Sequence, residues 1–189
     1  MFLLCTLVAL ASLPSAHAAP PEYPVWLGGF ADVGASTSPG VGGGFGALAG
    51  VMIGKGDNHN LALEGRVGEG LYASDVRTVG NIDFDVRYPG DSGPFVYLGF
   101  AHHHELSLDE ALTHPVGAIA ATYSGITHRT GFELGAGWDM ATPFPKSSFG
   151  ARIRPTVRVN AVVLPDGVSP SVYVVGNIGI LLGVGRPRS

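Results

Sequence analysis

Four of the chain's seven histidines stand at the two ends of one long connecting segment. Three of them run directly into a carboxylate, in the order His102-His103-His104-Glu105, and His128 opens the segment that follows. Neutral imidazoles together with a carboxylate are ligands that Zn²⁺ and Cu²⁺ accept. If the two flanking segments lie side by side, His103, Glu105 and His128 form a candidate metal site. The alternative is that these histidines are polar rim residues that pair with nearby acidic groups.

The same cluster offers a second chemistry, which is acyl hydrolysis. His103 could act as a base oriented by Glu105, but the nucleophile would have to come from a segment expected to be a loop. The two serines available there are Ser107 and Ser124. We therefore expect the protein not to be an enzyme and keep acyl hydrolysis as the alternative. Residues 40–46 are glycine-rich but lack the Lys-Ser/Thr pair of a phosphate-binding loop, so we expect no cofactor.

Alternation of charged and apolar residues is the strongest pattern in the chain. Between Asn81 and Tyr88, apolar residues alternate with Asp83, Asp85 and Arg87, which is the period of a β-strand with one wet face. Sorted in this way, six acidic residues and six arginines share one face of their segments: Glu64, Arg66, Asp83, Asp85, Arg87, Glu105, Arg129, Glu133, Asp139, Arg152, Arg154 and Arg158. The other face of the same segments is apolar.

The preference for arginine on the charged face indicates where that face lies. A guanidinium pairs well with carboxylates in a confined space, whereas a solvated face has little reason to favour arginine so strongly. We therefore expect the charges to form a paired network that plugs the lumen of a closed barrel, with the apolar face against lipid. The alternative is an exported, soluble, lipocalin-like barrel whose polar face is solvated.

Eight segments have the alternation of strands, and each is near the roughly ten residues that a tilted strand needs to cross a bilayer. They are Val25–Val33, Gly44–Gly54, Asn60–Leu71, Thr78–Tyr88, Phe95–His104, His128–Met140, Phe149–Val163 and Ser171–Val184. Several connections are short and turn-rich, but Leu106–Thr127 is long, and a capping-box pattern at Ser107–Glu110 predicts a turn of helix there. The even number of strands predicts an all-β, antiparallel up-and-down transmembrane barrel. Pro155 indicates a bulge in the seventh strand.

Composition narrows the class of protein further. The formal net charge is only −4, so no nucleic-acid partner is expected. Residues 1–18 have the apolar run and the Ala16-His17-Ala18 ending of a signal peptide, which leaves residues 19–189 as a single barrel domain. Cys5, the one cysteine, lies in the signal peptide, so no disulfide is expected to support the fold.

The signal, the eight alternating segments and the charge-paired face together resemble a known family. It comprises the small eight-stranded outer-membrane β-barrels of Gram-negative bacteria, such as the membrane domain of outer membrane protein A and its short relatives. The resemblance implies a barrel in the outer membrane, surrounded by lipid, with a structural or surface-interaction role. The long loop 106–127 is then the expected contact region for an extracellular ligand or protein. No histidine has a serine two residues later, the spacing that outer-membrane lipid A deacylases use.

Overall fold

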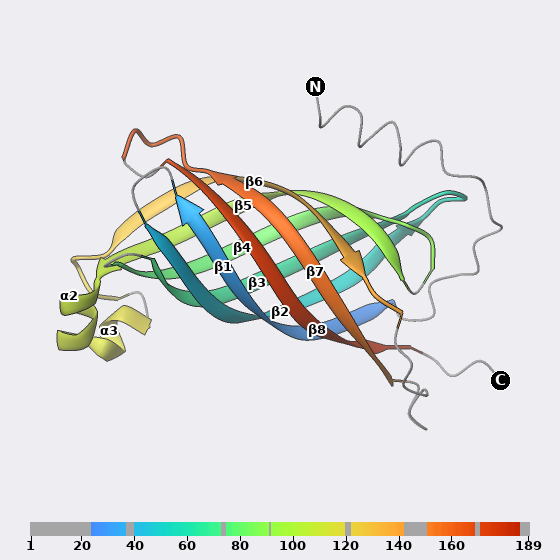
Figure 1. Ribbon diagram of the computed structural model, residues 1–189, viewed down its shortest axis with the longest axis horizontal. Coiled ribbons are helices and arrows are strands. Elements are labelled where there is room, and N and C mark those ends of the chain that lie inside the picture. Colours follow the sequence, from blue (N-terminus) through green and yellow to red (C-terminus); the bar gives the residue numbers. More distant parts are fainter. Residues whose placement is uncertain are drawn as a thin grey trace.

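The computed structural model describes residues 24–36, 40–72, 75–90, 92–119, 122–141, 151–168 and 171–185. Within them the chain forms a closed barrel of eight strands (Figure 1). The strands are β1 (Val25–Ser36), β2 (Val41–Lys55), β3 (Asn60–Tyr72), β4 (Asp75–Arg87), β5 (Gly93–Ser107), β6 (Thr127–Asp139), β7 (Ala151–Val163) and β8 (Val172–Val184). Two short helices, α2 (Leu108–Thr113) and α3 (Pro115–Ile119), lie between β5 and β6. No helix in these ranges is long and apolar enough to cross a membrane.

All eight strands expected from the alternation are present, and the differences lie mostly at their ends. β4 begins at Asp75 instead of Thr78, and β5 runs to Ser107 instead of His104. These extensions lie at the loop end of the barrel, where β3 and β4 remain paired up to Tyr72↔Asp75. The expected signal peptide at 1–18 lies outside the described residues.

Each strand pairs in antiparallel fashion with the next one in the chain, and β1 pairs with β8 to close the barrel. The register shifts once in the β2–β3 ladder, between Met52 and Gly54. The bulge expected at Pro155 is wrong, because the β7–β8 pairing runs through Pro155↔Ile180 without a shift. The last residue of β7 that pairs with β6 is Thr156, next to the proline. Pro155, which has no backbone N–H to donate, therefore lies just outside the β6–β7 ladder and is tolerated there.

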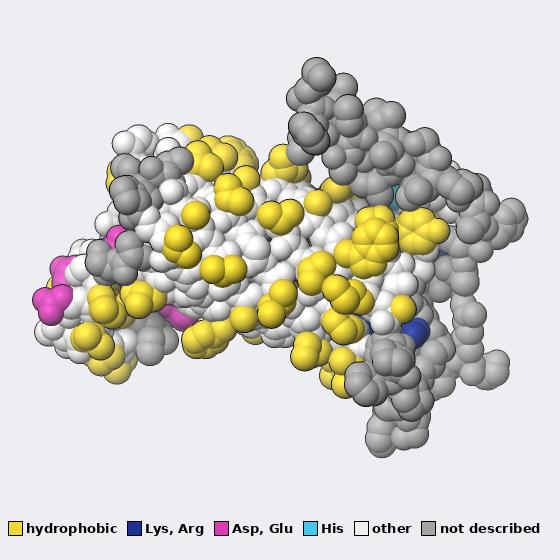
Figure 2. Space-filling model, in the orientation of Figure 1, with side chains coloured by type: hydrophobic (Ala, Val, Ile, Leu, Met, Phe, Trp, Pro, Cys, Tyr) yellow, Lys and Arg dark blue, Asp and Glu magenta, His cyan; other side chains and the backbone are white. Residues whose placement is uncertain are grey.

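The two faces of the barrel wall differ sharply in chemistry. Outward side chains are large and apolar, as in Phe45, which is 71% exposed, and Ile178, which is 66% exposed. Figure 2 shows these hydrophobic side chains spread over the wall, with acidic ones at the end that carries α2 and α3. Not all aromatic side chains near the strand ends face outward, since Trp26 and Tyr72 are buried inside the barrel. Trp138 does face outward.

Glycines on the inward face make room for the large side chains of the lumen. A Cβ at Gly50 would overlap the indole of Trp26, and one at Gly135 would overlap the ring of Tyr97. Gly65 faces outward, and a Cβ there would meet only a backbone oxygen, at 4.0 Å. Inward glycines are therefore part of how the interior is packed.

This difference predicts opposite outcomes for two alanine substitutions. Gly50→Ala forces a methyl group into Trp26 and should lower the free energy of unfolding by about 1–3 kcal/mol, the usual range for overpacking. Gly65→Ala should leave stability unchanged or slightly raised. Urea unfolding in lipid vesicles, followed by tryptophan fluorescence, measures both, and equal effects of the two substitutions would contradict this account of the packing.

Candidate functional site

The centre of the lumen is organised around the carboxylate of Glu64, which is fully buried on β3. Arg158 on β7 reaches it with both terminal nitrogens, one of them at 2.9 Å. Arg87 on β4 donates to the same group at 3.3 Å, and the indole nitrogen of Trp26 on β1 donates at 2.8 Å. One carboxylate thus ties four strands together across the inside of the barrel.

Further ion pairs continue from this centre in two directions. Arg66 binds Asp83 at 2.8 Å and also contacts Glu133, which links β3 and β4 to β6. Arg87 binds Asp139 at 2.7 Å as well as its own neighbour Asp85 at 2.6 Å. Because these side chains are almost completely buried, each charge depends on its partners for the interactions that water would otherwise supply.

A second, separate group of charges closes the loop end of the lumen. Glu105 accepts hydrogen bonds from Arg77 at 3.1 Å, from Arg129 at 3.0 Å and from the Tyr173 hydroxyl at 2.7 Å. Arg129 then reaches over the rim and binds Asp166 in the β7–β8 loop at 2.7 Å. This bond lowers the pKa of Asp166, an exposed residue outside the barrel strands, to about 2. The mouth is thus fastened to the β7–β8 loop.

Aromatic rings cover the faces of several guanidinium groups. Arg77 lies 3.7 Å from the ring centroid of Tyr173 and 4.3 Å from that of Tyr72. Arg87 lies 4.3 Å from the centroid of Phe95 and also packs over Trp26. Arginine suits such positions because its planar group pairs through its edge and stacks through its face.

Small cavities lie on either side of the central network. A cavity of about 40 Å³ separates it from the charges at the mouth and is lined by residues that include His103, Asn160 and Asn177. Another, of about 10 Å³, lies at the turn end beside Trp26 and Arg154. Spaces of this size hold roughly a water molecule or little more. The lumen is thus filled by side chains, as expected for an eight-stranded barrel.

Two solved structures are similar to this barrel over most of its length. The N-terminal β-barrel domain of OprF from Pseudomonas aeruginosa has a TM-score of 0.51 at 14% sequence identity, covering 83% of this chain and 96% of that one. Neisserial surface protein A has a TM-score of 0.54 at 12% identity, covering 84% and 95%. The chain has the fold of the eight-stranded outer-membrane β-barrels. The sequence itself matches no protein-family model and no curated protein.

The structure places the twelve charges expected for the barrel lumen on the inward-facing phase of their strands. Eleven of them form the two groups of ion pairs described above, with Arg154 reaching Asp139 at 3.7 Å. Arg152 has the same phase and lies half-buried near the turn end of β7. Sequence reasoning missed Arg77, Tyr173 and Asp166. Arg77 directly precedes the expected strand Thr78–Tyr88 and shares the phase of Asp83 and Asp85, so extending the alternation by one residue would have found it, whereas Asp166 lies in a loop and carries no such signal.

The histidines group differently from the set expected as a metal site. His103 is buried inside the barrel and Glu105 is engaged by two arginines, so both lie on the inner side of the wall. His128 lies on the outer side, where the structure brings it together with His102 and His104. The expected set of His103, Glu105 and His128 therefore does not come together, because neighbouring residues of a strand face opposite sides of the wall. His102, His104 and His128 come together in its place.

The groups considered for acyl hydrolysis do not come together either. The Ser107 hydroxyl caps α2, accepting from the backbone nitrogen of Glu110 at 3.3 Å and donating to its carboxylate at 2.7 Å. This confirms the predicted turn of helix with Ser107 as its N-cap, although the Glu110 carboxylate meets the Ser107 hydroxyl where a full capping box would use the Ser107 backbone nitrogen. Neither ring nitrogen of His103 has a hydrogen-bond partner among the described residues. The geometry thus supplies no hydrogen-bonded serine–histidine pair at this position.

The central role of Glu64 predicts a large loss of stability when its charge is removed. Glu64→Gln leaves Arg158 and Arg87 buried without their shared partner, and breaking such a network costs about 3–5 kcal/mol. The matched control is Glu69→Gln on the outward face of the same strand, where only a hydrogen bond from Thr78 is weakened, at a cost of about 1 kcal/mol. Urea unfolding in lipid vesicles distinguishes the two, and a loss at Glu64 no larger than that at Glu69 would contradict the central role.

The contact between Arg129 and Asp166 predicts a pH dependence of the β7–β8 loop. The pKa of Asp166 in the folded protein lies below its ordinary value of 3.8. The stabilisation that its contact with Arg129 gives to the folded loop is therefore present above about pH 4 and is lost as the pH falls through about 2. An NMR titration of the Asp166 carboxyl carbon should therefore show a midpoint near 2. In Arg129→Ala, the midpoint should return to the ordinary range, and an unchanged midpoint would show that another group holds this carboxylate.

Proposed function

We propose that this protein is an outer-membrane barrel with a sealed lumen and a structural or surface-interaction role, whose contact region is the loop 106–127. One observation carries the proposal, namely that the wall is apolar outside while its charges are paired inside. In water this arrangement would expose a band of large apolar side chains around every strand, which soluble monomeric proteins avoid. In a bilayer the same band is the surface that lipid covers.

The soluble, lipocalin-like alternative is disfavoured by the interior of the barrel. A barrel of that kind holds its ligand in a cavity inside the wall. Here the inside is occupied by Glu64, Arg158 and their partners, and the cavities beside them have volumes of only about 10 and 40 Å³. The interior therefore supports a scaffold and offers no room for a ligand of that class.

The loop between β5 and β6 supports the surface-interaction part of the proposal. Leu106, Ala111 and Ile126 form a small buried cluster that packs this loop on the end of the barrel. Leu112 on α2 and Val116 on α3, four residues apart, remain 72% and 79% exposed. Helices that leave apolar side chains in solvent are suited to contact another molecule.

The experiment for the membrane assignment is the mobility of the folded protein on gels. The protein should fractionate with outer membranes and run faster unheated than boiled, because a closed barrel resists unfolding by detergent. Recovery in the soluble periplasmic extract without this mobility shift would overturn the proposal.

The same preparation tests which end of the barrel faces outward. Leu112→Cys in the long loop should react with a membrane-impermeant maleimide on intact cells. Asp57→Cys, in the turn between β2 and β3, is the matched control and should react only after the outer membrane is permeabilised. The reverse pattern would place the loop on the periplasmic side and remove it as a surface contact.

A further inference from the structure

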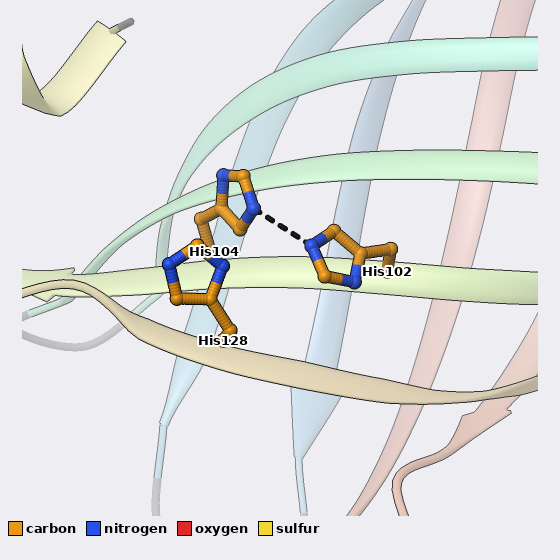
Figure 3. Close-up of side chains that lie close together, drawn as sticks. All are labelled: His102, His104 and His128. Atoms are coloured by element: carbon orange, nitrogen blue, oxygen red, sulfur yellow. Dashed lines mark hydrogen bonds between the residues drawn. The ribbon is translucent and has the colours of Figure 1, made fainter. Parts of the chain in front are cut away.

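Three imidazole rings converge on the outer wall of the barrel, on strands β5 and β6. The Nε2 atoms of His102 and His104 lie 2.7 Å apart, and the centroid of the His128 ring is 4.5 Å from that of His104. One ring nitrogen from each of the three lies within 4.8 Å of the other two. Figure 3 shows the rings turned toward one another, two from β5 and one from β6.

Strand geometry is sufficient to bring these rings together. His102 and His104 are two residues apart and so project from the same face of β5. His104 is paired directly with His128, and His102 is paired with Thr130. Beside His102, on β4, stands Gly80, where a Cβ would have no neighbour closer than a backbone oxygen at 3.9 Å. The cluster is thus held by backbone pairing and is open on one flank.

On β6, the cluster lies on the loop side of the last large apolar side chain of the outer face. Phe132 is the last large apolar residue on the outward face of β6 toward the loops, and it is also where pairing with β7 ends, at Val163. His128 lies four residues further along, about 13 Å at the rise of an extended strand. On this strand the histidines therefore lie near the loop end of the wall, where the outward side chains are polar.

The surroundings of the cluster are polar and suit a cation. Glu69, Thr78, His104 and His128 form one outward row across four consecutive strands, β3 to β6. The Thr78 hydroxyl donates to Glu69 at 2.7 Å. Glu69 lies two strands from His104, roughly 10 Å by the spacing of paired strands, so it contributes negative charge without being a ligand.

We propose that His102, His104 and His128 bind a divalent transition-metal ion of the class that prefers imidazole, such as Zn²⁺ or Cu²⁺. Metal–nitrogen bonds of about 2.0–2.1 Å in a tetrahedral site place the ligand nitrogens about 3.3 Å apart. The observed separations bracket this distance, from 2.7 Å to within 4.8 Å, so small rotations of the rings produce the site. One ion would take the place of the hydrogen bond between the Nε2 atoms of His102 and His104, bind a nitrogen of all three rings and leave a coordination position open to solvent.

Such an ion would also link the two strands that carry the long loop. β5 leads into α2, and β6 begins where the loop returns. A ligand that binds the folded state alone stabilises it in proportion to the logarithm of its concentration. Metal binding should therefore slow proteolysis within residues 108–126.

The test uses untagged protein, folded in detergent, with Zn²⁺ as the titrant and calorimetry and metal analysis as readouts. We expect one ion per chain, and a loss of affinity of at least tenfold in His104→Ala and in His128→Ala. His59→Ala, in the exposed turn between β2 and β3, is the matched control and should bind as the unaltered protein does. The heat-dependent gel mobility of each variant shows that it has folded.

Two further measurements distinguish this site from others. His103→Ala, on the inner face of β5, should retain Zn²⁺ binding, whereas its loss there would place the ion inside the barrel and overturn the proposal. The electron paramagnetic resonance spectrum of bound Cu²⁺ should show coupling to several nitrogens in the unaltered protein and to fewer in His128→Ala. Absence of saturable binding, or equal weakening in His59→Ala, would also overturn the proposal.

Discussion

The pairing of buried charges around Glu64 is the constraint on which the rest of the structure depends. An eight-stranded barrel is too narrow to hold water around each charged group, so the most deeply buried carboxylates, such as Glu64 and Asp83, are met by guanidinium groups at short range. Such contacts require a particular register, because a slip of one residue would turn the charges to the outer face and the apolar residues inward. The contact between Glu64 on β3 and Arg158 on β7 thus specifies how distant parts of the chain align, in addition to any stability it adds.

Filling the lumen with long side chains creates a second requirement, which the glycines meet. Trp26 lies flat against Gly50, and Tyr97 lies against Gly135, so the backbone itself forms part of the packing surface. The glycines on the inner face therefore follow from the same narrow interior as the ion pairs. Aromatic rings also separate the guanidinium groups of Arg77 and Arg87 from their surroundings while leaving the edges of these groups free to bind carboxylates.

The sequence predicted the strands and the lumen face well, because both follow from a period of two residues that any strand must obey. Asp83, Asp85 and Arg87 could be assigned to one face without knowing their partners. Which carboxylate meets which arginine could not be predicted, since that depends on the stagger between strands. The histidines illustrate this limit. His103 and His128 were grouped although they face opposite sides of the wall, and this becomes clear only from the register, in which His128 is paired with His104.

The same register gives the loop end of the barrel two faces with different chemistry. On the inner face, Arg129 joins Glu105 to Asp166 and so fastens the β7–β8 loop over the mouth. On the outer face, the residues next to these in sequence are His104 and His128. Since His103↔Arg129 and His104↔His128 are adjacent pairs in one ladder, a change on either face acts on the same short stretch of backbone. The β5–β6 loop, the β7–β8 loop and the histidine cluster are therefore all attached to the same short stretch of β5 and β6. At this end of the barrel, metal binding on the outer face and the contact of Arg129 with Asp166 over the mouth can influence each other.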